Sequence, residues 1–367
     1  MIHWDDATID RFQRALLTWY DAHGRDLPWR RDHDPYHVWL SEVMLQQTGV
    51  STVIPYYEKW LAHWPTIAEL AAADEDAVLK EWAGLGYYSR ARNLLKTARV
   101  ITNERGGQWP QDAAGLKQLP GIGDYVAGAV ASIAFSQPVP AIDGNAYRVF
   151  SRLLLIDTDI RSSAAKKVFN DAITPLIPAD RPGDFNQAVM DLGSSYMRAK
   201  DPDSAHSPVA AFDAAYQQGV TDQYPVKAPK KKPVAKAYTA LALLAPDGQV
   251  VWQQRPSRGL LADLWTWPLL TGDQQGASAP ELIQQLADEH GIILDPALVL
   301  RVQPVGENGV VHVFTHQRWT ITVVQLTLAD VPPLPANARW LPLTQQELAL
   351  PTMQRKVSAY YNRNKAE

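Results

Sequence analysis

The chain has 367 residues, of which 46% are hydrophobic and 20% charged, with a formal net charge of −4, so we expect a two-domain globular protein without an overall basic character. It contains no cysteine, which excludes disulfide bonds, cysteine nucleophiles and zinc or iron–sulfur sites built on thiolates. The sequence shows no export signal and no apolar run near the roughly 20 residues of a membrane span, so we expect a cytoplasmic protein with no membrane partner.

The first part of the chain is predicted to be helical. Apolar residues recur at helical spacing over residues 6–23. Asp34 followed by Pro35 is typical of the start of a second helix, which we expect to continue to Thr48. Further helices are expected near residues 54–63, 66–72, 74–82 and 89–103.

Glu42 lies in the middle of the second helix, on the same face as Val38, Trp39 and Leu45. A carboxylate among large apolar side chains is costly unless it is protonated or paired. Glu42 is therefore a candidate for a carboxyl group with a raised pKa. The alternative is a structural glutamate that is bonded to neighbouring backbone or to an arginine.

A turn rich in glycine and tyrosine, residues 84–88, precedes the helix over residues 89–103, which carries four basic side chains. A charged helix face is usually no more than solvated. Beside an exposed pair of tyrosines it could instead follow a phosphate backbone, with an aromatic wedge next to it. Arg90 and Arg92 are the candidate phosphate contacts.

The stretch from Leu119 to Asn145 combines two helix starts. Gly121 and Gly123 form a tight turn before an apolar helical run, and such a turn presents backbone N–H groups to an anion. Asp143 precedes Gly144 and Asn145 at the start of the next helix, where the helix dipole and N–H donors favour an ionised carboxylate. The alternative is an ordinary loop followed by an N-cap.

The character of the chain changes after a Pro/Lys-rich linker, which includes Lys230–Lys232. Before it we expect helices over residues 146–155, 162–173, 183–196 and 209–218. After it we expect a hairpin of strands 238–245 and 250–254, strands near 264–270, 298–305, 310–314 and 319–328, a helix over 280–290 and a last helix. The expected domains are thus an all-α domain over 1–218, the linker over 219–236, and an α+β domain over 237–367.

Together these segments resemble the MutY-type adenine DNA glycosylases of the helix-hairpin-helix superfamily. The matching residues are 27–30, 39–48, 84–93, 119–123, 143–145, 185–193 and, more weakly, 259–265. The resemblance implies a helix-hairpin-helix glycosylase domain followed by a Nudix-like domain. It implies base excision repair by a monomer that acts on duplex DNA and removes adenine mispaired with 8-oxoguanine or guanine.

The resemblance also implies roles for single residues. Glu42 would protonate the departing base and Asp143 would stabilise the sugar cation, with Tyr125 and Asn145 orienting the pair. Further residues would line the adenine pocket, namely Arg25, Trp29, Arg30, Leu45 and Gln187. Others would contact DNA, with Gln47 and Tyr87 as the wedge that enters the gap left by the flipped base, Gly121 and Gly123 on a phosphate, and Arg90 and Arg92 on the backbone.

Tyr125 bears on the type of reaction. Bifunctional relatives carry a nucleophilic lysine at this point of the motif, which forms a Schiff base with the sugar. With tyrosine there, we expect a monofunctional glycosylase. An endonuclease III-like glycosylase with lyase activity, and a mismatch-binding protein without catalysis, are the alternatives.

One segment departs from the family. Most members bind a four-iron–four-sulfur cluster through four cysteines after the Asp-Leu-Gly motif, and here those positions hold Met197, Ser204, Ser207 and Asp213. We therefore expect residues 197–213 to form a loop without a cluster, and we expect neither a cofactor nor a metal. The loop is expected to be held by packing, with Phe212 and Tyr216 among the packing residues.

The C-terminal domain departs from Nudix hydrolases as well. Gln284 and Gln285 stand where hydrolases have metal-binding carboxylates, which disfavours a nucleotide-pool hydrolase. By resemblance, Phe314, Thr315 and His316 would form the loop that reads 8-oxoguanine, with threonine in place of the serine of the family pattern.

Overall fold

The computed structural model describes residues 1–229, 232–344 and 348–365, which form two compact units, Met1–Pro229 and Lys230–Glu367. The division falls inside the Pro/Lys segment of the chain. Of the basic stretch Lys230–Lys232, residues 230 and 231 lie outside the described part. No helix in the described part of the chain is long and apolar enough to cross a membrane.

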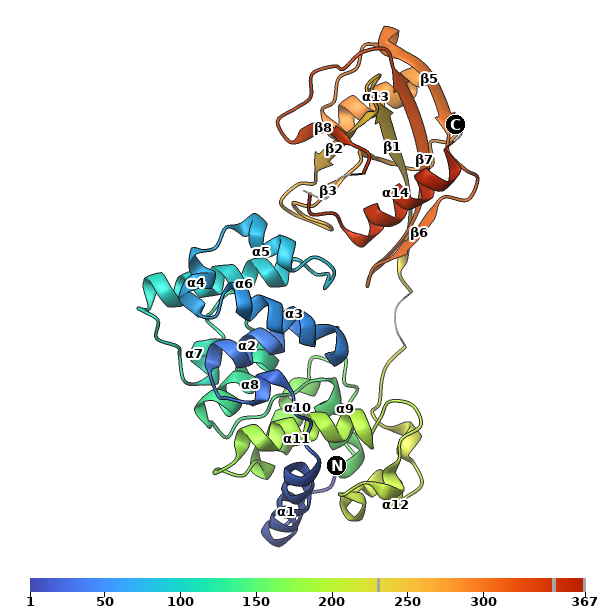
Figure 1. Ribbon diagram of the computed structural model, residues 1–367. Coiled ribbons are helices and arrows are strands. Elements are labelled where there is room, and N and C mark those ends of the chain that lie inside the picture. The colour runs from blue at the N-terminus through green and yellow to red at the C-terminus, as the bar shows by residue number, and fades with distance from the viewer. Residues whose placement is uncertain (230–231, 345–347, 366–367) are drawn as a thin grey trace. The chain divides into compact units, whose positions relative to one another are not determined.

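The first unit consists of helices, as expected for an all-α domain (Figure 1). Their bounds are α1 Asp6–His23, α2 Pro35–Met44, α3 Val50–His63, α4 Ile67–Ala72, α5 Glu75–Glu81, α6 Ser89–Arg99, α7 Ala113–Leu116, α8 Asp124–Phe135, α9 Gly144–Leu154, α10 Ala165–Ile173, α11 Pro182–Ser195 and α12 Ala214–Gln217. Short 3₁₀ turns lie at Pro28–Arg30, Thr174–Leu176, Ser204–His206, Ala210–Phe212 and Thr221–Gln223, and a π-helical turn at Val100–Glu104 extends α6.

Two hydrophobic cores hold these helices together. One is built by α2 to α8 around buried tryptophans, among them Trp39, Trp60 and Trp82. The other joins α1 to α9, α10 and α11 around Phe12, Phe150 and other apolar side chains. Because α2 belongs to the first core and α11 to the second, residues that project from these two helices meet at the boundary between the cores.

The boundaries of several helices differ from the sequence-based expectation, with α3 beginning at Val50 rather than at residue 54 and α10 at Ala165 rather than at residue 162. The second helix ends at Met44 rather than at Thr48, because Gln47 adopts a left-handed backbone conformation with φ +60°. The helix expected over 209–218 is divided into a 3₁₀ turn and α12, since Asp213 lies outside the helical region and caps α12 through its side chain. Asp213 Oδ1 accepts a hydrogen bond from Tyr216 N at 3.0 Å.

The second unit is a mixed sheet with a helix on each face, which confirms the α+β expectation (Figure 1). The strands are β1 Val234–Leu244, β2 Gln249–Gln254, β3 Trp265–Thr266, β4 Leu269–Thr271, β5 Val299–Pro304, β6 Val310–Val313, β7 Gln317–Leu328 and β8 Ala338–Pro342, and the helices are α13 Ala279–His290 and α14 Thr352–Asn364, with a 3₁₀ turn at Pro296–Leu298. The sheet order is β3-β2-β1-β7-β5, with β4 on β1, β6 on β7 and β8 on β2.

Successive side chains of β1 point to opposite faces of the sheet, and each face is covered by a different helix. Ala240 and Ala242 pack in a cluster with α14, whereas Leu241 and Leu243 pack in a cluster with α13. The expected hairpin is present, with Leu244 paired to Val250 across the turn. The single strand expected over 264–270 is wrong: β3 and β4 are separate and pair with different strands, β2 and β1. β8 was not expected.

Candidate active site

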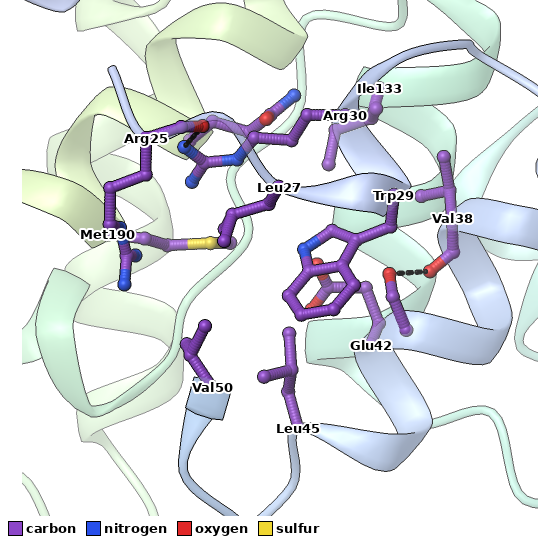
Figure 2. Close-up of a pocket in the computed structure, with 12 residues that line it drawn as sticks. Arg25, Leu27, Trp29, Arg30, Val38, Glu42, Leu45, Val50, Ile133 and Met190 are labelled. Carbon is purple, nitrogen blue, oxygen red and sulfur yellow. Dashed lines mark hydrogen bonds between the residues drawn. The ribbon is translucent and has the colours of Figure 1, made fainter. Parts of the chain in front are cut away.

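A pocket opens between α2 and α11 (Figure 2). Glu42 and Trp29 point into it in Figure 2, with Leu45 beside them. Its walls come from both cores, since α2, α3, α8, α11 and the Pro28–Arg30 turn all contribute side chains. The lining residues are Arg25, Leu27, Trp29, Arg30, Val38, Ser41, Glu42, Leu45, Val50, Ile133, Gln187 and Met190.

Glu42 is buried at this pocket, with 4% of its surface exposed. Burial raises the pKa of its carboxyl group to about 7, and the nearby charge of Asp143 adds to the increase, while the hydroxyl of Tyr125 and the charge of Arg30 oppose it. The Tyr125 hydroxyl donates a hydrogen bond to Glu42 Oε2. Burial also raises the pKa of Tyr125 well above its ordinary value, so the phenol keeps its proton.

Asp143 caps α9 as the sequence suggested. Its Oδ1 accepts hydrogen bonds from Asn145 N at 2.8 Å and Ala146 N at 2.7 Å, and its Oδ2 accepts one from Asn145 Nδ2 at 2.7 Å. We expected these donors and the helix dipole to dominate, but burial outweighs them and raises the pKa of Asp143. Buried Glu42 and half-buried Asp143 thus interact through their charges, and several donors surround Asp143.

An arginine pair closes one side of the pocket. Arg30 donates to Asp191 at 2.7 and 3.0 Å, and Arg25 donates to the same carboxylate through Nε at 2.7 Å. Asp191 is buried, and its hydrogen bonds and the charges of both arginines hold its pKa below the ordinary value despite that burial. Gln187 Oε1 accepts a hydrogen bond from the Tyr20 hydroxyl at 3.1 Å. Sequence reasoning missed Asp191 and Tyr20, although Asp191 lies within one of the motifs that carry the resemblance.

Arg148 is a second residue that sequence reasoning missed. It donates to Asn145 Oδ1 at 2.6 Å, to Gly193 O at 2.7 Å and to Met197 O at 2.7 Å. Because Asn145 in turn binds Asp143, these bonds connect Asp143 to the first residue of the loop at 197–213. Nothing in the local sequence marks this long-range contact.

Gln47 and Tyr87 both lie at exposed turn tips in the left-handed conformation, with φ +60° and +48°. Arg90, which we expected to contact a phosphate, is buried instead, with 8% of its surface exposed. That expectation is wrong because the Arg90 guanidinium already binds backbone carbonyl groups of both turns. Arg92 pairs with Glu75 at 2.9 Å at the surface.

The glycine turn before α8 has the expected shape. Gly121 has φ +74°, and a Cβ there would lie 2.5 Å from Cβ of Asn93. At Gly123 an added Cβ would meet no described atom within 4 Å. Gly123 is the exposed N-cap residue of α8, whereas Gly121 is required by the turn itself.

The side chains at the four cluster positions do not fit an iron–sulfur cluster, because thioether, hydroxyl and carboxylate groups replace every thiolate. All four residues are buried, and Met197 and Asp213 are fully so. Phe212 packs on Trp4 and Phe12 at ring distances of 5.7 and 5.6 Å, as a packed loop requires. Tyr216 was also expected to pack, but it is 43% exposed. No group of three or more histidine, aspartate or glutamate residues suited to a metal occurs among the described residues.

In the second unit, Thr315 and His316 form the exposed tip of the turn between β6 and β7, closed by a hydrogen bond from Phe314 N to Gln317 O at 2.7 Å. The Phe314 ring contacts Trp319 at 4.7 Å and His312 at 4.6 Å. On α13, Gln284 donates to Asp288 at 2.9 Å and Gln285 donates to Glu289 at 2.7 Å. These amides therefore engage the helix's own carboxylates.

Comparison with known proteins agrees with this two-part organisation. Residues 40–175 match the HhH-GPD superfamily of base excision DNA repair proteins, and residues 239–360 match the NUDIX domain. The adenine DNA glycosylase of Mus musculus is 37% identical over 97% of this chain and 79% of its own length. The adenine DNA glycosylase of Homo sapiens is 37% identical over 97% of this chain and 75% of its own length.

Among solved structures, a thermostable thymine-DNA glycosylase superposes with a TM-score of 0.52 at 25% identity. The match covers 58% of this chain and 98% of the other. This share corresponds to a single domain of the present chain, in agreement with its division into two units.

Proposed function

Because the chain belongs to the adenine DNA glycosylase family, we propose that it removes adenine mispaired with 8-oxoguanine or guanine from duplex DNA. In this proposal the enzyme is monofunctional and works as a monomer. The observation that carries the proposal is the burial of the Glu42 carboxyl group in a pocket that Arg30 and Gln187 also line. This burial raises the pKa of Glu42 to about 7.

Glu42 supplies the proton in the proposed reaction. Burial keeps its carboxyl group largely neutral below about pH 7, so it can protonate the imidazole ring of the flipped adenine. The N-glycosidic bond then breaks, and its electron pair leaves with the base. Asp143 in its ionised form stabilises the positive charge on the sugar, and a water molecule adds to the sugar carbon and loses a proton.

The roles of the pocket residues follow from their chemistry. Trp29 and Leu45 offer apolar contact area to a planar base, while Gln187 offers an amide for hydrogen bonding. Arg25 and Arg30 are held by Asp191 and define the polar side of the pocket. Tyr125 keeps the Glu42 carboxyl group in place through its hydroxyl.

A lyase reaction is the second candidate, and it requires an amine that can form a Schiff base with the sugar. No lysine occurs among the described residues that line the pocket. The neutral phenol of Tyr125 cannot replace an amine. We therefore propose excision without strand cleavage.

The test is incubation of the full-length protein with a duplex that contains an adenine opposite 8-oxoguanine. The proposal predicts strand breaks at the adenine after alkali and none before it, and no covalent complex after borohydride reduction. Breaks before alkali, together with borohydride trapping, would support the lyase. Tight binding with no breaks after alkali would support the mismatch-binding protein.

We also propose that the enzyme works without an iron–sulfur cluster, a proposal supported by the donor set of Met197, Ser204, Ser207 and Asp213. Elemental analysis of the active purified protein should find iron and zinc far below one atom per chain. Stoichiometric iron or zinc that tracks with activity would overturn it.

A further inference from the structure

One buried arginine joins the two exposed turns that carry Gln47 and Tyr87. Gln47 follows the end of α2, whereas Tyr87 precedes α6, so the two tips come from separate segments of the chain. Arg90 lies in the first turn of α6. Its guanidinium reaches back to both segments.

The two terminal nitrogens of Arg90 divide their bonds between the turns. Nη1 donates to Val43 O at 2.8 Å and to Gln46 O at 2.8 Å, at the end of α2. Nη2 donates to Leu85 O at 2.9 Å and to Gly86 O at 3.2 Å, in the other turn. The planar guanidinium has donors on two sides in a fixed geometry, which a lysine ammonium lacks.

These bonds act on the peptide groups next to the tips. The carbonyl groups of Gln46 and Gly86 immediately precede Gln47 and Tyr87, the two residues in the left-handed conformation. This conformation is unfavourable for a residue other than glycine, so it persists where the surroundings hold it. The Arg90 guanidinium also stacks near the Tyr87 ring, 5.7 Å from its centroid.

We propose that Arg90 is a positioning residue that holds Gln47 and Tyr87 as one preformed wedge, ready to enter the stack as the adenine leaves it. This inference rests on the proposed function, which supplies the need to flip a base. A preformed wedge loses no conformational entropy by being ordered during base extrusion. More of the binding free energy is then available to offset the cost of unstacking the base. Arg90 acts through the two tips and contacts neither phosphate nor the reacting atoms.

Arg99 provides a matched control on the same helix. It also donates to two backbone carbonyl groups, Ala71 O at 3.2 Å and Ala73 O at 3.0 Å. These carbonyl groups lie at the end of α4 rather than at the wedge. Arg99→Gln therefore removes the same kind of bond without releasing either tip.

The experiment uses the full-length protein and a duplex with 2-aminopurine as the target base opposite 8-oxoguanine. Fluorescence reports base extrusion whether or not excision follows, and titrations at several salt concentrations report affinity. Arg90→Gln and the milder Arg90→Lys, which keeps a buried cation, should each lower the extrusion amplitude by fivefold or more. The salt dependence of binding should not change, and Arg99→Gln should behave as the unsubstituted protein.

Two results would overturn the proposal. A phosphate contact predicts that Arg90→Gln reduces the slope of log affinity against log salt by about one, with extrusion unchanged in Arg90→Lys. The second result concerns a protein in which Gln47 and Tyr87 are both replaced by alanine. If Arg90 only positions the wedge, adding Arg90→Lys to this protein lowers the extrusion amplitude by less than about twofold. If Arg90 has a general structural role, adding it lowers the amplitude by about fivefold. A protein that extrudes the base but never excises it would refute the proposed function and leave this inference standing.

Discussion

At the scale of single residues, Glu42 and Asp143 differ in their hydrogen-bond partners, and Glu42 is buried whereas Asp143 is half-buried. Within the described part of the chain, Glu42 has one donor, the Tyr125 hydroxyl, whereas Asp143 has two backbone N–H groups and an amide. Burial raises the pKa of both groups, to about 7 for Glu42. The hydrogen-bond donors make Asp143 the better site for negative charge, and leave Glu42 as the group that carries a proton.

This division predicts the pH dependence of excision. Glu42 must be protonated, so the single-turnover rate should fall as the pH rises through about 7. Asp143 must be ionised, so the rate should also fall on the acid side, at a pH above the ordinary pKa of an aspartate because the Asp143 pKa is raised. Rates measured from about pH 5 to about pH 9 should form a bell. A rate that is flat across neutral pH would argue against a titrating acid.

The same pKa predicts an effect on stability. The folded protein holds a proton on Glu42 at pH values between the ordinary pKa of 4.5 and about 7, where the unfolded chain has lost it. The free energy of unfolding therefore decreases as the pH rises through this window, by roughly 3 kcal/mol for this group at about 1.4 kcal/mol per pKa unit. Glu42→Gln should remove that decrease and unfold later than the unsubstituted protein in urea at about pH 8. Equal stability of the two at that pH would mean that Glu42 is not desolvated.

At the scale of elements, the two glycines of the turn before α8 have different predicted roles, Gly121 in the turn itself and Gly123 in phosphate binding. Gly123→Ala fits the free protein, because the added Cβ meets no described atom within 4 Å. It should leave the melting temperature nearly unchanged and weaken duplex binding about tenfold, since a methyl group there keeps a phosphate away from the N–H groups. Gly121→Ala is the matched comparison: its φ of +74° and the contact with Asn93 predict a loss of stability. Binding unaffected by Gly123→Ala would exclude this turn as the phosphate site.

Local signals in the sequence predicted much of this architecture, and long-range contacts account for what they missed. Asp34 and Pro35 mark the start of α2, and apolar spacing predicted a buried Glu42 on it. The end of α2 could not be predicted, because the carbonyl group of Gln46 is bound by Arg90 from another helix. The pairing of Asp191 with two arginines likewise joins segments far apart in the chain, and a single sequence carries no signal for such pairs.

At the scale of the whole molecule, we propose that the first unit removes the adenine and that the second unit recognises the base opposite it. Thr315 and His316 lie at the tip of an exposed turn. Phe314, next to them in the chain, packs on Trp319 and His312 and anchors the turn. Replacing Thr315 and His316 with alanine should therefore leave the fold intact. In the full-length enzyme it should reduce the preference for 8-oxoguanine over guanine opposite adenine by tenfold or more. An unchanged ratio of the two excision rates would show that this turn is not the reader.

The most direct test of the account is single-turnover excision of adenine opposite 8-oxoguanine by Glu42→Gln and Asp143→Asn, measured at saturating enzyme together with duplex affinity. Both substitutions keep the size of the side chain, so the pocket and its contacts should remain. Each variant should bind the duplex within a few-fold of the unsubstituted protein and excise adenine at least about a thousandfold more slowly. Near-normal excision by either variant would contradict the roles proposed for Glu42 and Asp143.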